Sequence, residues 1–538
     1  MATNGNNTSA FDQAVDSFMS QQDSQALTGT LLLFDHALQG GDNLEAVQKI
    51  HAKIPLPYFF HLLQADYEDQ GLTIEMLCKV LTALLKHATF SEIQQTPELL
   101  GALKQALASP LDPIHGLGIA QVEKVVDASD DVVATLFASD ILTELINGLT
   151  SDSIGIAERS KRALLKITNT RARLDALVSE EGARNQIQQL LNSESAVVRT
   201  RMLETIVEMA LKSDDAEATI ESVGFLEPLV KDLSTTDILT RFNLIEMLAE
   251  LGATASGASF LDRKQVLQQF ATAVEQPTRT GSLELSAIVK VYGKMGESER
   301  VDFAEYDAKY RILDQIEKLM VGDDDFDPDE PLKIEAMSSF GLVGGNILNL
   351  EYVTNSACAE TFSSMLASLR REAKVAWFHT VAQIFSCSID PSHETERIAH
   401  AFYKKLEGQG QSPFMARLLA AAKSQAIELA MAALTLMLTL AAYPFAVKAM
   451  MASQHHRDMM AFLLDRDSDL THAAKVARHE TIQRILTTVR RHALEDAHGI
   501  TLPPLLTPEQ LSRLDLAYRE GPFFQRATAT VAIKDLAA

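Results

Sequence analysis

The chain has 538 residues, of which 46% are hydrophobic and 22% are charged, which excludes disorder of the whole sequence. The length is too great for one compact core and indicates several domains or a modular array. The formal net charge is -24, from 48 basic and 72 acidic residues. This charge argues against nucleic acid and anionic membranes as partners, because neutralising phosphates requires clustered Lys and Arg.

The N-terminal residues MATNGNNTSAFDQAVD lack the basic and apolar regions of a secretory signal, and we expect residues 1–22 to form a disordered arm. The three cysteines, Cys78, Cys358 and Cys387, form no CxxC pair. Such sparse cysteines suit a reducing compartment and argue against a disulfide framework. We therefore expect a cytoplasmic protein, with the nucleus as a second compartment.

Apolar residues recur with a fixed period along the first half of the chain. One column comprises Leu103, Leu145, Ile187 and Leu229, since 145 minus 103, 187 minus 145 and 229 minus 187 all give 42. A second column, four residues later, comprises Leu107, Leu149, Leu191 and Leu233. Two apolar columns in phase over four units indicate one helical face that recurs in register.

Each unit reads as two helices. The first is seen in SDILTELINGL, EEGARNQIQQLL and VGFLEPLVKDL, and the second in LNSESAVVRTRMLETIVEMA and LSTTDILTRFNLIEMLAEL. Ser195 and Asp237 stand where an N-cap is needed, and Arg199 and Arg241 follow each cap by four residues. This pattern resembles HEAT and armadillo repeats, whose length of about 40 to 47 residues agrees.

Because one such repeat cannot bury its own apolar face, neighbouring repeats must stack. We predict an all-α fold, an α-solenoid of HEAT/armadillo-like helical repeats over residues 23–520 that forms a curved superhelix. Later second-type helices are expected in SLELSAIVKVYGKMG, DEPLKIEAMSSFGLVGGN and SQAIELAMAALTLMLTLAAYP, with insertions between them.

The C-terminal segment YREGPFFQRATATVA differs from the helical sequence before it. Pro522 cannot continue a helix, and its neighbours Phe523, Phe524, Thr528, Thr530 and Val531 favour extended backbone, so we expect an extended tail over 521–538. Phe523 and Phe524 could fold back as a lid on the last apolar face of the array, contributing about 3 to 6 kcal/mol before entropy costs. The alternative is that this tail docks on a partner.

Several motifs suggest chemistry but fail their tests. The uncharged stretch 429–447 is long enough to span a membrane, yet we interpret it as a buried solenoid helix. The acidic run DDDFDPDE lacks the Gly and Glu of a calcium loop, since Pro328 and Ile334 stand there, and we expect a solvated loop that caps the next helix. HETER has Arg397 where a zinc protease needs histidine. The segment GLVGGN is expected to end a helix with left-handed backbone.

No catalytic, cofactor or metal residue is therefore predicted, and the candidate site is a protein-binding face. Outward positions of the second helices also recur every 42 residues, in three columns: Arg159, Arg201 and Asn243; Arg162, Glu204 and Glu246; and Lys166, Glu208 and Glu250. These charges could be no more than a solvated surface. A mixed-charge face many repeats long is also a natural cradle for helices of another protein.

The C-terminal run LDLAYREGPFFQRATATVA resembles the end of the 26S proteasome non-ATPase regulatory subunit 5 family. GLVGGN and the helix pair around QAIELAMAALTLMLTLAAYPFAVKAMM and LDRDSDLTHAAKVARHETIQRIL add to the resemblance, which spans roughly residues 90 to 538. It implies a chaperone for assembling the base of the regulatory particle. Members grip the C-terminal domain of an AAA ATPase subunit, regulatory subunit 7, together with its paired ATPase and a scaffold subunit, and delay docking on the core particle.

The resemblance implies no cofactor and a non-enzymatic protein, which we expect to be monomeric when free. Two alternatives remain open. A generic armadillo-like adaptor is one, although import receptors of this architecture would show regular Trp and Asn ladders, and this chain has one tryptophan, Trp377. An enzyme on a helical scaffold is the other, and turnover of ATP or of a metal-dependent substrate would favour it.

Overall fold

The computed structural model describes residues 4–21, 24–39, 44–65, 67, 70–86, 88–388, 391–408, 412–451, 456–465, 470–497 and 503–524. These residues form helices joined by turns, with no β-strand among them and one isolated bridge between Asp323 and Phe326. The all-α prediction is confirmed. The chain divides into two compact units, Met1–Ser234 (unit 1) and Thr235–Ala538 (unit 2).

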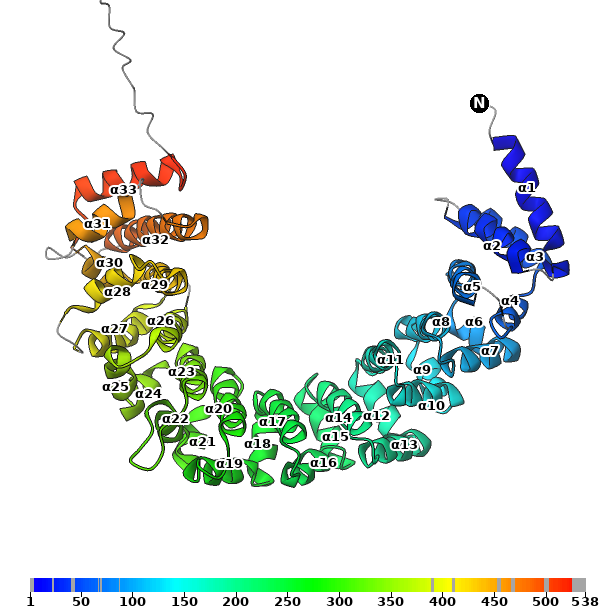
Figure 1. Cartoon of the computed structure of the whole chain (residues 1–538), viewed down its shortest axis with the longest axis horizontal. Coiled ribbons are helices and arrows are strands. Elements are labelled where there is room, and N and C mark those ends of the chain that lie inside the picture. Colours follow the sequence, from blue (N-terminus) through cyan, green and yellow to red (C-terminus); the bar gives the residue numbers. More distant parts are fainter. Residues whose placement is uncertain are drawn as a thin grey trace, which may run out of the picture. The chain divides into compact units, whose positions relative to one another are not determined.

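In unit 1, every third helix belongs to one row in which each helix packs against the next (Figure 1). These row helices are α2 (Ser24–Leu38), α5 (Gln70–Leu84), α8 (Asp112–Val122), α11 (Ile154–Ile167) and α14 (Ala196–Ala210). The other elements of unit 1 are α1 (Asn4–Ser17), η1 (Phe18–Ser20), α3 (Leu44–Lys53), α4 (Leu56–Leu62), α6 (Phe90–Gln95), α7 (Pro97–Leu107), η2 (Glu123–Asp127), α9 (Asp130–Phe137), α10 (Asp140–Asn147), η3 (Gly148–Thr150), α12 (Arg171–Ser179), α13 (Glu181–Leu191), α15 (Asp214–Ser222), α16 (Glu227–Lys231) and η4 (Asp232–Ser234).

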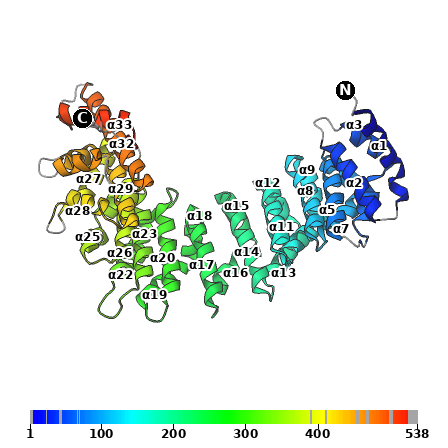
Figure 2. The same ribbon diagram turned by 45° about the horizontal axis from the view of Figure 1, so that its top comes forward.

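Unit 2 has a row of the same kind, which can be followed from green to orange in Figure 2. Its row helices are α17 (Ile238–Gly252), α20 (Ser282–Glu297), α23 (Glu330–Gly345), α26 (Arg371–Phe385), α29 (Ile427–Leu440) and α32 (His472–Ala497). The other elements are α18 (Ala255–Arg263), α19 (Val266–Glu275), α21 (Phe303–Tyr310), α22 (Ile312–Val321), α24 (Leu350–Thr354), α25 (Ala357–Ser364), η5 (Met365–Ala367), α27 (His393–Glu407), α28 (Phe414–Ala422), α30 (Pro444–Met450), α31 (His456–Leu464) and α33 (Pro508–Glu520).

Each repeat has three helices, so the prediction of two helices per repeat is wrong. Between α11 and α14, for example, lie α12 and α13, and α12 packs against the equivalent helices α9 and α15 of the repeats on either side. Three helices are the armadillo form of this repeat length. The third helix escaped detection because it is short: α12 has nine residues, which begin after the N-cap Thr170.

The leucine columns and the caps are confirmed. All eight residues of the two 42-residue columns are buried. The Ser195 hydroxyl accepts a hydrogen bond from Val198 N at 3.5 Å, and the Asp237 carboxylate accepts one from Leu239 N at 3.2 Å. The helices predicted in unit 2 are also present, as α20, α23 and α29.

The segment predicted as a disordered arm contains α1 and η1 instead. Phe18 is fully buried, with its ring 5.1 Å from that of Phe34 and 5.0 Å from that of Phe59. Phe11, Val15 and Phe18 share one helical face, with Val15 buried beside Phe18. This short apolar stripe holds the segment against α2 and α4, and the polar residues around it obscured the pattern.

Glycines let the row helices of unit 2 approach closely. A Cβ added at Gly293 of α20 would lie 2.9 Å from Ser339 Cα of α23, and one added at Gly296 would lie 2.5 Å from Val343 Cγ2. A Cβ at Gly341 of α23 would lie 3.0 Å from Thr380 Cγ2 of α26. GLVGGN does end α23, but its glycines have no positive φ, so the left-handed prediction is wrong there. These glycines serve contact with α26, not a turn.

The other interpretations of unusual segments hold where the structure describes them. The apolar stretch 429–447 is largely buried, as predicted, but forms parts of two helices: most of α29, whose Ala433, Leu436 and Leu440 are fully buried, and the first residues of α30, which begins at Pro444. The acidic run is a turn in which the Asp329 carboxylate caps α23 by accepting from Leu332 N at 3.0 Å. Among the described residues no single helix is long and apolar enough to cross a membrane; one bent pair, Asp130–Phe137 with Asp140–Thr150, meets the length and composition test only when its two halves are joined.

The end of unit 2 is covered by α33 and not by the aromatic tail. Leu514 and Ala517 of α33 are buried, and the Tyr518 ring stacks on His479 of α32 with centroids 5.2 Å apart. Phe523 stacks on His472 at 4.3 Å, yet Phe523 and Phe524 remain 51% and 39% exposed. Phe523 thus folds back onto α32, but neither ring is buried, so the prediction that the two rings form a lid stays a prediction. Residues 525–538, with Thr528, Thr530 and Val531, lie outside the described residues.

Candidate protein-binding face

The nine candidate residues all lie on row helices. Arg159, Arg162 and Lys166 are on α11, and Arg201, Glu204 and Glu208 are on α14, both in unit 1. Asn243, Glu246 and Glu250 are on α17 in unit 2. The structure thus brings each triplet onto one helix and places the first two triplets on neighbouring helices of the same row.

Two of the arginines join neighbouring helices and offer little to a partner. Arg159 forms an ion pair with Asp112 at the start of α8 and donates to the Asp112 carbonyl at 3.4 Å. Arg201 Nη1 donates to the carbonyls of Leu149 and Ser151, at 3.1 and 2.7 Å, in the turn before α11. Their role is to fix how each row helix begins beside the next.

The remaining charges of unit 1 form a ladder across the row helices. Lys161 Nζ lies 3.4 Å from the Glu204 carboxylate and 2.6 Å from that of Glu208, and Lys166 Nζ lies 2.8 Å from Glu123. Burial lowers the pKa of Lys161, but Glu208, Glu204 and Glu158 together raise it above its usual value. Arg162 remains on the surface, 3.9 Å from Glu158 of its own helix.

Unit 2 has a second ladder that begins on α17. Lys290 Nζ on α20 lies 2.6 Å from the Glu246 carboxylate, and this hydrogen bond is the main reason that the pKa of Lys290 is raised. Burial raises the pKa of Glu335 on α23, while Lys290 opposes that shift. Asn243 and Glu250 are exposed.

The sequence columns missed the residues that complete the ladders, namely Lys161, Glu123, Lys290 and Glu335. The signal was present: Lys161 and Glu204, and also Lys166 and Glu123, are 43 residues apart, while Lys290 and Glu246 are 44 apart. These paired side chains meet one or two positions away from the 42-residue columns, so a search for opposite charges at 43 and 44 would have found Lys161, Glu123 and Lys290. It would have missed Glu335, which follows Lys290 by 45 residues.

The two ladders leave part of their charge exposed to solvent. Lys166 and Lys290 are partly exposed and each pairs with one carboxylate, so a charge on another protein would compete for them at modest cost, whereas Lys161 pairs with two carboxylates and is mostly buried. Among the described residues, no group of His, Cys, Asp and Glu is arranged to hold a metal ion. Within the described ladders, no nucleophile and base are assembled side by side.

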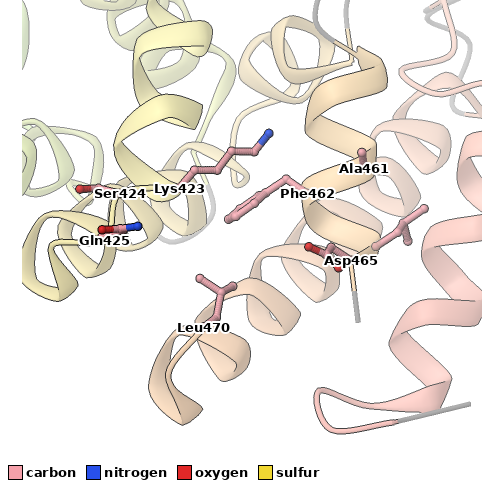
Figure 3. Close-up of a pocket in the computed structure, with 8 residues that line it drawn as sticks. Lys423, Ser424, Gln425, Ala461, Phe462, Asp465 and Leu470 are labelled. Atoms are coloured by element: carbon pink, nitrogen blue, oxygen red, sulfur yellow. The ribbon is translucent and has the colours of Figure 1, made fainter. Parts of the chain in front are cut away.

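A cavity of about 590 Å³ lies in unit 2 between the turn that joins α28 to α29 and the helix α31 (Figure 3). Figure 3 shows Lys423 of the turn reaching over Phe462 of α31, with Leu470 on the opposite wall. The Ser424 hydroxyl of the same turn accepts from Ala426 N at 3.2 Å, so it is engaged in the turn. The cavity is mainly apolar, and the charged residues that line it are Lys423 and Asp465.

Rows of three-helix repeats stacked in sequence order define an armadillo-like α-solenoid. The crystal structure of a Kap121p mutant shows the same fold, with a TM-score of 0.51 at 13% identity over 94% of this chain and 53% of that one.

The chain belongs to the family described as proteasome non-ATPase 26S subunit, whose model matches residues 21–537. It is similar to the 26S proteasome non-ATPase regulatory subunit 5 of Bos taurus, at 22% identity over 91% of this chain and 93% of that protein. The Homo sapiens protein of the same name is 21% identical over 93% of this chain and 94% of its own length. The family match begins well before residue 90, so it includes N-terminal repeats in which the sequence resemblance was not visible.

Proposed function

We propose that the protein is a chaperone for assembly of the regulatory particle base of the 26S proteasome. It binds the C-terminal domain of an AAA ATPase subunit, regulatory subunit 7, and holds it with its paired ATPase and a scaffold subunit. By occupying that domain it delays docking of the ATPase on the core particle. The observation that carries this proposal is the family match, which covers residues 21–537.

The structure supports a binding mechanism without chemistry. The charge ladders of α11 and α14, and of α17, α20 and α23, offer partly exposed carboxylates and amines that can pair with charges of a helical client. A face of this kind gives specificity and a fast encounter more than raw affinity. The protein works in the cytoplasm, and in the nucleus as a second compartment, as a monomer when free and without a cofactor.

The test is affinity purification of the tagged full-length chain, followed by quantitative mass spectrometry. We expect two base ATPases and their scaffold subunit to be enriched over core-particle subunits. Recovery of complete proteasomes with core-particle subunits in equal amount would contradict the proposal, and so would the absence of base subunits.

A charge-reversal variant tests the face itself. Arg162→Glu with Lys166→Glu should weaken binding of the purified ATPase C-terminal domain about 10-fold, since like charges across an interface cost about 1 to several kcal/mol. The matched control is Lys104→Glu on α7, which also breaks one exposed ion pair, with Asp140 at 2.6 Å, but lies outside the row helices. Equal affinities for the two variants would remove the ladder of unit 1 from the binding site.

A further inference from the structure

Three successive row helices of unit 1 begin with apolar side chains that the described fold leaves about half exposed or more. Leu111 is the N-cap of α8, Ile154 is the first residue of α11, and Val197 is the second residue of α14. Their exposed fractions are 45%, 78% and 58%. Single exposed apolar residues are ordinary, but one at the start of each of three successive row helices is a pattern. We name these three residues the apolar row.

Contacts between the helix starts show that members of the apolar row are neighbours. Ser153, which precedes Ile154, donates from its hydroxyl to the carboxylate of Asp112, which follows Leu111, at 3.0 Å. Arg201, four residues after Val197, donates to Ser151 O in the turn before Ile154. Packed helices lie about 8 to 10 Å apart, so the apolar row is a line of three side chains at roughly that spacing.

Unit 2 has the same feature on its own helices. α17 opens with Ile238 and Leu239, and α20 carries Leu283 at its second position, all three about half exposed or more. Arg241 and Glu284 join these two helix starts at 2.6 Å. Exposed apolar side chains thus recur at helix starts in both units. We therefore regard their exposure as a feature of the repeat.

The apolar row is flanked by negative charge. Asp152 and Glu194 stand two and three residues before Ile154 and Val197, and both are exposed. Neither forms an ion pair with a described residue. Of the guanidinium groups near the helix starts, Arg159 pairs with Asp112 and Arg199 with Asp232 at 3.7 Å, while Arg201 is held by the carbonyls of Leu149 and Ser151. A partner with Lys or Arg beside its apolar residues would be complementary, whereas a second copy of this chain would bring acid against acid.

The spacing and the caps select a helical partner. On an α-helix, residues seven apart lie on one face about 10.5 Å apart, so a helix that crosses the helix starts at a slight angle can meet all three side chains. An extended peptide would need hydrogen bonds for its backbone. The hydroxyls here are engaged, since Ser153 accepts from Ile156 N and Ser195 from Val198 N. A helical partner forms its own backbone hydrogen bonds and needs none from these hydroxyls.

We propose that the apolar row of unit 1 is a docking site for a basic amphipathic helix of another protein, with aliphatic residues one heptad apart. The inference goes beyond the proposed function and does not depend on the proteasome assignment, because it rests on exposure, spacing and charge alone.

The test uses the full-length chain and a labelled synthetic helix of about three heptads, with Leu at every seventh position and Lys at the flanking positions. Binding is measured by fluorescence anisotropy. Ile154→Ser with Val197→Ser should weaken binding at least 10-fold, and Asp152→Asn with Glu194→Gln should weaken it about 3-fold or more and reduce its salt dependence. The control is Leu348→Ser, an equally exposed leucine outside the row helices.

Three results would overturn the proposal: equal binding of the variant with Ile154→Ser and Val197→Ser, equal binding of a probe with Glu in place of Lys, or no binding of the probe. Light scattering of the free chain supplies a fourth, since a dimer that this double substitution abolishes would assign the apolar row to a second copy. If that variant loses its helical circular dichroism, Ile154→Thr with Val197→Thr takes its place.

Discussion

The ammonium of Lys290 lies 2.6 Å from the carboxylate of Glu246, although 44 residues separate them in the chain. They lie on neighbouring row helices, α20 and α17. Their separation of 44 residues is two more than the 42-residue spacing of the leucine columns. The spacing of the buried leucines therefore gives the repeat length, whereas the spacing of the paired surface charges depends on the offset between adjacent helices.

Swapping the charges of this pair should restore what a single reversal loses. Glu246→Lys alone places two cations together and should lower the free energy of unfolding by about 1 kcal/mol or less, since both side chains are partly exposed. Adding Lys290→Glu should recover most of that loss. Urea midpoints of the parent chain and the two variants measure the effect, and a double variant no more stable than the single one would show that the pair is not energetically coupled.

Because α20 packs closely on α23, replacing glycine by alanine should affect stability differently at this contact and at an open helix surface. Gly296→Ala should destabilise unit 2 by about 1 to 3 kcal/mol, because the new Cβ meets Val343. Gly101→Ala on α7, where nothing lies within 4 Å, should instead be neutral or stabilise by about 0.5 to 1 kcal/mol. Thermal melts followed by circular dichroism test both, and Gly296→Ala with Val343→Ala should recover stability if the clash is the cause.

Burial of His115 on α8 predicts a loss of stability in mild acid. Burial, followed by the Arg159 cation, lowers the pKa of His115 from 6.5 to about 4, with Asp112 opposing, and the ring faces Ser160 at 3.3 Å. Below pH 6.5 the His115 ring binds a proton in the unfolded chain, whereas in the folded chain it binds one only near pH 4. Stability should therefore fall across that window by about 1.4 kcal/mol per pH unit, or roughly 2 kcal/mol by pH 5.

Comparison of the urea midpoint at pH 7 and pH 5, for the parent chain and His115→Gln, isolates this contribution. The variant should lose less stability than the parent over the same interval. The Asp112 carboxylate, whose pKa the Arg159 hydrogen bond lowers, titrates below the window and so does not confuse the reading. Equal losses for both chains would show that His115 is accessible to protons in the fold.

Replacing the aromatic pair of the tail should cost little stability. Phe523 and Phe524 are about half exposed, so Phe523→Ala with Phe524→Ala should lower the free energy of unfolding by about 1 to 2 kcal/mol, well below the cost of truncating buried rings. Phe18→Ala, at a fully buried ring, should cost about 3 to 5 kcal/mol. If the tail docks on the client, the tail variant should lose client affinity with only this small loss of stability, and unchanged affinity would exclude the two rings as a docking element.

The sequence could predict the parts of this fold that repeat over long distances. Leu103 and its equivalents kept phase because each fills the same buried position, and Ser195 and Asp237 marked helix starts through one local hydrogen bond. α12 could not be predicted in the same way, because nine residues hold few periodic positions and its burial depends on α9 and α15. Lys161 was missed for a related reason, since its partners Glu204 and Glu208 depend on the offset between two helices, which no single helix encodes.

Residues that contact each other in unit 1 lie close together along the chain, so the fold can form during synthesis. α12 packs against the equivalent helices of the adjacent repeats and against the next helix, α13, and Lys161 meets carboxylates 43 and 47 residues further on. A nascent chain can thus close each contact as soon as about one more repeat has left the ribosome, without waiting for the C-terminus. Truncated translation products of unit 1 should therefore already resist proteolysis up to the last complete repeat.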